Sequence, residues 1–115
     1  MKNPELRTTV RALRAASKKG GPAIWEALAD ELDTAKRRRA AVNLSRINRH
    51  SGAGDIVAVP GKVLGAGSLR HPVTVAAFSF SETAREKIAL MEGRALTLME
   101  LLAEGVEPSK IRIVK

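Results

Sequence analysis

The chain has 115 residues, no cysteine, and a net charge of +8 from 20 Lys+Arg against 12 Asp+Glu, with a pI near 10.6. This length is typical of one domain, and the lack of cysteine excludes disulfides, thiol nucleophiles and Cys-based zinc sites. No apolar run approaches the roughly 20 residues that span a bilayer, and the charged start does not resemble a signal peptide. These features predict a small, soluble, cytoplasmic protein.

The first fifty residues predict three helices. Asn3 and Pro4 begin the first helix, and its apolar residues recur at helical spacing (Leu6, Val10, Leu13). Two lysines followed by two glycines (18–21) end it. Pro22 begins a second helix, which runs to about Leu32. A third helix is predicted from Asp33 or Thr34 to about Arg49, with Ala40, Leu44 and Ile47 as its apolar stripe.

The second half alternates short strands and helices. Strands are predicted at 55–59, ended by Pro60-Gly61, at 73–80, and at 111–114, with an apolar pair at 63–64 between the first two. Ser81 caps a helix that ends at Gly93, and Thr97 with Glu100 forms a capping box for a helix that stops at Gly105. The predicted fold class is α/β: basic N-terminal helices followed by a small irregular layered β/α unit with short strands. Residues 1–115 form one expected domain, with a basic helical part (1–50) and an α/β part (51–115).

The positive charge is concentrated in the first half of the chain. Residues 1–50 carry 12 Lys+Arg and 5 Asp+Glu, whereas residues 51–115 carry 8 and 7. Such asymmetry indicates a polyanionic partner for the first half, with a solvated basic face as the alternative.

No residues form a recognisable catalytic or metal site. The two histidines, His50 and His71, have no acidic partners at metal-ligand spacing, and no serine lies in a nucleophile elbow. The glycine-rich segment 61–67 fits neither a phosphate loop nor a dinucleotide fingerprint. It is interpreted as turns that bring the backbone close either to the protein's own core or to a phosphate backbone beside Lys62 and Arg70.

The strongest basic cluster is the run at 36–39, Lys-Arg-Arg-Arg, at the start of the predicted third helix. Arginine matches phosphate oxygens bidentately, and 12 of the 20 cations are arginine. Aromatic residues make up 3% and lie in core-like patterns, so a base-stacking platform is not expected. Two modes remain open: recognition of the backbone of folded RNA, and a helix-turn-helix on DNA formed by residues 23–32 and 35–49.

Three segments, in order, resemble one family. They are the arginine-rich helix segment at 38–47 (RRAAVNLSRI), the glycine segment at 59–67 (VPGKVLGAG) and the strand-to-helix segment at 73–81 (VTVAAFSFS). Together they resemble archaeal and eukaryotic large-subunit ribosomal protein eighteen-e, which is related to bacterial large-subunit ribosomal protein fifteen. The resemblance runs over essentially the whole chain, and the short length is typical of archaeal members.

The resemblance implies a non-enzymatic structural constituent of the large ribosomal subunit, without a cofactor, metal, membrane or small-molecule substrate. Its implied partners are large-subunit ribosomal RNA and neighbouring ribosomal proteins. Mapped by position, the implied RNA-binding residues are Lys18, Lys19, Lys36, Arg37, Arg38, Arg39, Asn43, Arg46 and Arg49, with Lys62 and Arg70 near the glycine segment. A helix-turn-helix DNA-binding protein is the alternative, and an enzyme acting on RNA lacks a plausible acid/base pair.

Overall fold

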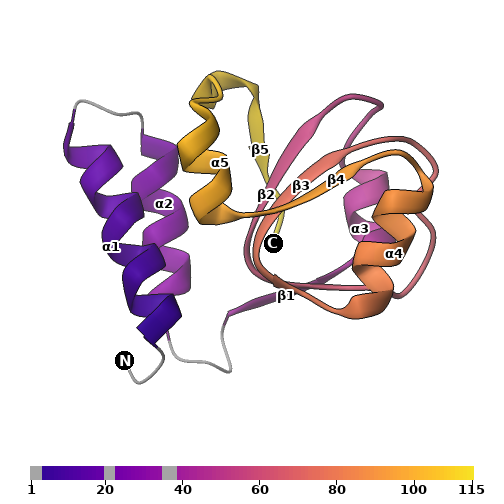
Figure 1. Cartoon of the computed structure of the whole chain (residues 1–115), viewed down its shortest axis with the longest axis horizontal. Coiled ribbons are helices and arrows are strands. Elements are labelled where there is room, and N and C mark those ends of the chain that lie inside the picture. The colour runs from indigo at the N-terminus through magenta and orange to yellow at the C-terminus, as the bar shows by residue number, and fades with distance from the viewer. Residues whose placement is uncertain (1–3, 20–22, 35–38) are drawn as a thin grey trace.

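A computed structural model describes residues 4–19, 23–34 and 39–115 of the chain. The helices are α1 (Pro4–Lys18), α2 (Ala23–Leu32), α3 (Leu44–Arg49), α4 (Glu82–Leu90) and α5 (Leu98–Glu104), with a 3-10 turn at Pro108–Lys110. The strands are β1 (Ala40–Asn43), β2 (Ile56–Leu64), β3 (Thr74–Phe80), β4 (Arg94–Thr97) and β5 (Ile111–Ile113). Figure 1 shows α1 and α2 side by side at one end, with α3 and α4 at the other. The fold is α/β, as predicted.

The strands form one parallel sheet in the order β1-β2-β3-β4, with β5 also paired to β2. β5 pairs with Ile56–Ala58 and β1 with Gly61–Leu64, while β3 pairs along most of the strand. Because a strand has only two edges, β5 and β1 lie one after the other on the edge of β2 opposite β3. A parallel sheet of this kind needs cover on both faces.

Two apolar clusters provide that cover. On one face, leucines of α1, α2 and α5 pack with Trp25 on the small residues Ala58 and Ala76. On the other face, α3 and α4 contribute Leu44, Ile47, Ala84 and Ile88, which pack on valines of β2 and β3. Side chains alternate along β3, because Val75 and Ala77 face one cluster and Ala76 faces the other.

Local signals in the sequence set several helix ends. The Ser81 side chain accepts a hydrogen bond from the Ala84 N–H at 3.1 Å, which caps α4 as predicted. Thr97 and Glu100 form the predicted capping box of α5, and Gly105 ends that helix with a left-handed φ of 65°. The predicted helix-start residues Asn3 and Pro22 lie outside the described residues.

The predicted third helix is wrong over much of its length. Residues 35–38 of this prediction lie outside the described residues. In its described part, residues 40–43 form β1, paired in register with residues 61–64, and only Leu44–Arg49 is helical. The spacing of Ala40, Leu44 and Ile47 fits a helix locally, but hydrogen bonding to β2 and burial of Val42 favour the strand. Arg39, Asn43, Arg46 and His50 therefore do not share one face of a single helix.

The predicted end of β2 at Pro60-Gly61 is also wrong, since the strand continues to Leu64. The register with β3 shifts between Val59 and Lys62, and such an irregularity accommodates a proline that cannot donate to the ladder. A Cβ on Gly61 would lie 2.0 Å from the carbonyl oxygen of Ala40, so glycine allows β1 to approach. β4 was not predicted, because its four residues join α4 to α5 without an independent strand signal.

Candidate nucleic-acid interface

The predicted site residues do not gather at one place. Lys36, Arg37 and Arg38 lie outside the described residues. Lys18 and Lys19 are exposed at the C-terminal end of α1. In Figure 1, α1 lies at the opposite end of the molecule from α3, which carries Arg46 and Arg49.

Three further predicted residues lie around β1. The Nε of Arg39 donates to the carbonyl of Leu32 at 3.1 Å, so part of this half-buried side chain holds the end of α2. Lys62 is exposed on β2 and pairs in register with Ala41 of β1. Ala41 lies two positions after Arg39. Asn43 is half-buried at the N-cap of α3 and makes no side-chain capping hydrogen bond.

The remaining predicted residues lie around α3, where the structure places two polar hollows. We call this region the α3 surface: Ser45, Arg46, Asn48, Arg49, His50, Ser68, Arg70 and Arg112. The first, the α3–loop hollow, has a volume of about 370 Å³ and is lined by Ser45, Asn48, Arg49, Ser68 and Arg70. The second, the C-terminal hollow, has a volume of about 440 Å³ and is lined by Arg46, His50, Arg112, Ile113, Val114 and Lys115. The predicted residues Arg49 and Arg70, which are 21 positions apart, thus meet in one hollow.

The α3 surface has few acidic neighbours. Between positions 34 and 81 the chain carries eight Lys and Arg residues and a single acidic residue, Asp55. Asp55 lies 3.6 Å from Arg112, and Arg46 donates to the Lys115 carbonyl at 3.0 Å. Within the described ranges no ion pair involves Arg49 or Arg70, so the charges of these two arginines are available to an external anion.

The basic face of α1 is different, because part of its charge is neutralised inside the protein. Arg14 lies 3.3 Å from Asp30 and 3.1 Å from Asp33 of the neighbouring α2 end. Another exposed arginine, Arg94, is paired with Glu104. Asp30 and Asp33 thus reduce the positive charge that this part of α1 presents.

The glycine segment approaches the protein itself rather than leaving a space for phosphate. A Cβ on Gly65 would lie 2.7 Å from Thr83, and one on Gly67 would lie 2.4 Å from the Cβ of Ser45. Gly67 also has a φ of +84°, which favours glycine. Of the two readings of this segment, packing on the protein's own elements is correct for Gly61, Gly65 and Gly67, and Arg70 follows the segment on the exposed side.

His71 is bonded within the protein, whereas His50 is exposed and lines the C-terminal hollow. His71 Nε2 lies 3.0 Å from the Ser51 hydroxyl, which donates to the Ile47 carbonyl. Among the described residues, no three acidic or histidine side chains are placed to hold a metal ion. None of the described helices is long and apolar enough to cross a membrane.

The aromatic residues do not offer a stacking platform on the α3 surface. Trp25 is buried, as predicted, whereas Phe78 and Phe80 are half-buried at the edges of the two core clusters. The Arg85 guanidinium lies 4.9 Å from the centroid of the Phe80 ring and covers it.

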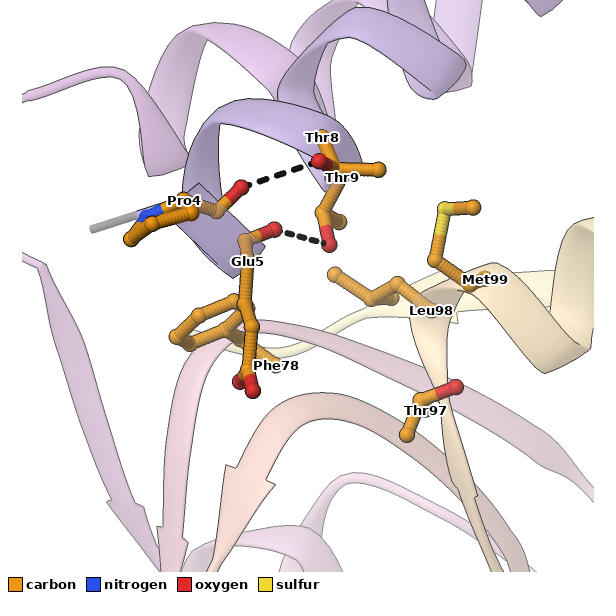
Figure 2. Close-up of a pocket in the computed structure, with 8 residues that line it drawn as sticks. All are labelled: Pro4, Glu5, Thr8, Thr9, Phe78, Thr97, Leu98 and Met99. Atoms are coloured by element: carbon orange, nitrogen blue, oxygen red, sulfur yellow. Dashed lines mark hydrogen bonds between the residues drawn. The ribbon is translucent and has the colours of Figure 1, made fainter. Parts of the chain in front are cut away.

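A further hollow of about 360 Å³ is mainly apolar and lies between the first turns of α1 and α5 (Figure 2). Its wall includes Phe78, Leu98 and Met99. The hydroxyls of Thr8 and Thr9 bond to backbone carbonyls of their own helix. No described lysine or arginine lines it, so it does not belong to the basic interface.

The predicted set of RNA-binding residues lacks five residues of the α3 surface: Ser45, Asn48, His50, Ser68 and Arg112. The serines and the asparagine carry no charge, and Arg112 lies in a strand far along the chain. One signal in the sequence could have indicated this region. The segment 34–81 contains a single acidic residue, and this charge distribution identifies the region more sharply than a comparison of the two halves of the chain.

Residues 23–96 match the family described as "Ribosomal proteins 50S-L15, 50S-L18e, 60S-L27A". The chain belongs to this family. The match includes β1, α3, the glycine segment and α4, and therefore both sides of the α3–loop hollow. The family consists of structural ribosomal proteins rather than enzymes, as predicted.

Curated relatives agree with this assignment over almost the whole chain. The chain is 48% identical to "Large ribosomal subunit protein eL18" of Methanothermobacter thermautotrophicus, over 98% of this chain and 93% of the relative. It is 45% identical to the protein of that name from Methanococcus maripaludis, over 97% and 93%. For Sulfolobus acidocaldarius the identity is 48%, over 83% of this chain and 80% of the relative. These relatives are archaeal, in agreement with the prediction that the short length is typical of archaeal members.

Proposed function

We propose that this chain is a structural constituent of the large subunit of the cytoplasmic ribosome. It binds and organises large-subunit ribosomal RNA through contacts of Arg and Lys side chains with phosphates. The observation that carries the proposal is the α3 surface, where Arg46, Arg49 and Arg70 line two hollows, and where Arg49 and Arg70 pair with no described acid. Relatives named as large ribosomal subunit proteins identify the particle.

Arginines on a rigid framework suit this role. Each phosphate contact releases counterions, which supplies much of the affinity and makes it depend on salt. The helix α3 is anchored by buried Leu44 and Ile47, so its arginines start from a fixed backbone. RNA segments that would repel one another are thereby held close together.

The other predicted residues are proposed to make additional contacts with the RNA. They are Lys18 and Lys19 at the end of α1, Arg39, Asn43 and Lys62 around β1, and Lys36, Arg37 and Arg38, which lie outside the described residues. Neighbouring large-subunit proteins are the proposed protein partners.

The alternative helix-turn-helix is disfavoured by β1. A recognition helix over 35–49 is interrupted by the strand Ala40–Asn43, and α3 has only six residues. No other described element follows α2 by a short turn, as the motif requires.

Gradient fractionation tests the proposal. A tagged chain expressed in an archaeal host is expected to sediment with large subunits and to remain there after a salt wash. The purified chain is expected to prefer large-subunit rRNA to duplex DNA at equal ionic strength. Absence from large subunits, or a preference for DNA, would overturn the proposal.

The basic run at 36–39 is tested separately. Replacing Arg37, Arg38 and Arg39 together by glutamine is expected to reduce the salt dependence of rRNA binding, by about 0.7–0.9 in log–log slope per lost contact. An unchanged slope would show that the phosphates contact other residues.

A further inference from the structure

We propose that the α3–loop hollow is a preformed site for one ribose–phosphate unit of an RNA backbone, and that Lys87 positions its wall without touching RNA. The proposal rests on the proposed function and deepens it. The hollow lies between α3 and the segment 68–70, which follows the glycine loop at 65–67.

The lining of the hollow has the chemistry that such a unit requires. The guanidinium groups of Arg49 and Arg70 match a phosphate in charge and in hydrogen-bond geometry. Neutral polar groups lie beside them: the hydroxyls of Ser45 and Ser68 and the side chain of Asn48. A hydroxyl both donates and accepts, so it can pair with the ribose 2′-OH, the group that distinguishes RNA from DNA.

The glycine loop, Gly65-Ala66-Gly67, leads into the lining residue Ser68 and is fixed from two sides. From α4, the Nζ of Lys87 donates to the carbonyls of Gly65 at 2.7 Å and Gly67 at 3.0 Å. From α3, the backbone N–H of Ser45 donates to the carbonyl of Ala66 at 3.3 Å. Three consecutive carbonyls of the loop are therefore held by neighbouring helices.

The far end of the segment 68–70 is held as well. The Arg70 backbone N–H donates to the Asn48 side-chain oxygen at 2.9 Å, which leaves the amide group of Asn48 as a donor. Ser68 and Arg70 thus emerge from a backbone that is bonded at both ends. A site held in this way loses less conformational entropy on binding than one formed by free side chains.

Lys87 differs in role from the arginines. Its side chain is half-buried, its ammonium group is occupied by two backbone carbonyls, and it does not line the hollow. Its effect on RNA binding must therefore pass through the loop, and this separates it experimentally from a residue that contacts phosphate.

The test measures affinity and its salt dependence together. The full chain is titrated with large-subunit rRNA of Methanothermobacter thermautotrophicus, the source of a 48% identical relative, at several KCl concentrations. R49Q/R70Q is expected to lose affinity by an order of magnitude or more, and the log–log slope falls by roughly 1.4–1.8, for two contacts. R14Q/R94Q removes the same charge from two arginines that are already paired, and its slope is expected to stay unchanged.

The neutral and positioning residues give a different signature. S45A/S68A is expected to weaken rRNA binding about 3- to 10-fold per lost hydrogen bond, with the slope unchanged, and to leave duplex DNA binding unaffected. K87M is expected to weaken rRNA binding with the slope unchanged, and K87R, which keeps charged donors, to recover most of the loss. Circular dichroism and urea unfolding establish that each variant is folded. If K87M does not fold, rRNA binding is measured with K87R instead.

Each outcome decides one part of the proposal. Suppose that the wild type binds rRNA while R49Q/R70Q has the same affinity and the same salt slope as R14Q/R94Q. In that case the hollow is not a binding site, although the proposed function stands. A slope reduced by about 0.7–0.9 in K87M would make Lys87 a phosphate contact instead. Equal losses on DNA and RNA in S45A/S68A would overturn the ribose contact. Failure of the wild type to bind rRNA at all would overturn the proposed function itself.

Discussion

The contact between the glycine loop and α3 predicts that Gly67 resists substitution for two separable reasons. Its φ of +84° is unfavourable for any residue with a Cβ, at a cost of about 1–2 kcal/mol. In addition, the new Cβ of Gly67→Ala would lie 2.4 Å from the Cβ of Ser45, so the loop or α3 must move. Such overpacking costs about 1–3 kcal/mol. The expected loss in the free energy of unfolding is therefore about 2–5 kcal/mol.

Gly54 offers a matched control. It has nearly the same φ, +83°, but nothing lies within 4 Å of the position that its Cβ would take. Gly54→Ala should therefore lose only the backbone cost of about 1–2 kcal/mol. Urea unfolding of both variants at one temperature gives the two losses, and their difference isolates the clash with α3.

A second substitution tests the origin of the clash. Ser45→Gly removes the side chain that the new methyl group meets. The double variant with Gly67→Ala should therefore lose less free energy of unfolding than the two single variants lose together. The expected coupling is on the order of 1 kcal/mol. Equal losses in Gly54→Ala and Gly67→Ala, or no coupling with Ser45→Gly, would refute the account of a loop packed tightly on α3.

Three further predictions concern the framework. Ile47→Ala, at a fully buried position of α3, should reduce the free energy of unfolding by about 2–5 kcal/mol in urea unfolding, and a loss below about 1 kcal/mol would contradict its role as an anchor. Gly61→Ala places a Cβ 2.0 Å from the Ala40 carbonyl oxygen, so amide exchange in β1 should accelerate, and unchanged protection would contradict the tight β1–β2 contact. The backbone N–H of Thr97, and then its side chain, lower the pKa of the Glu100 carboxyl. The capping box therefore stabilises the fold above the ordinary glutamate pKa, and this contribution is lost as pH falls through the lowered pKa. An NMR titration that places this pKa at or above the ordinary value would refute the assignment.

Much of the helical framework is readable from short-range signals. The apolar stripe of α1, the Ser81 cap and the capping box at Thr97 each depend on residues within one or two turns. Their physics is local, and the structure confirms them. The two-sided apolar pattern of β3 likewise indicates a covered sheet, which the structure has.

The misassigned segments depend on partners that are distant in sequence. Residues 40–43 carry a helical spacing, and they become a strand because residues 61–64 lie beside them. Pro60 and Gly61 are ordinary breakers in isolation, but here an irregular register and a close approach to Ala40 keep them within β2. Local propensity cannot indicate either pairing.

The candidate site shows the same limit. Charge identifies the arginines of α3, and the position of Arg70 beside the glycine segment singles it out as a further candidate. That Arg49 and Arg70 line one hollow follows only from packing of the glycine loop on α3. Lys87 carries no sequence signal that separates it from a solvated lysine, since its two carbonyl partners lie 20 and 22 positions away.

The most direct test of the central claim is a structure of the large ribosomal subunit assembled with this chain. We expect RNA phosphate oxygens within about 4 Å of the guanidinium groups of Arg49 and Arg70, the distance of an ion pair. We also expect a ribose beside Ser45 or Ser68. An α3 surface that faces solvent or another protein in the assembled subunit, with no RNA in either hollow, would contradict the claim.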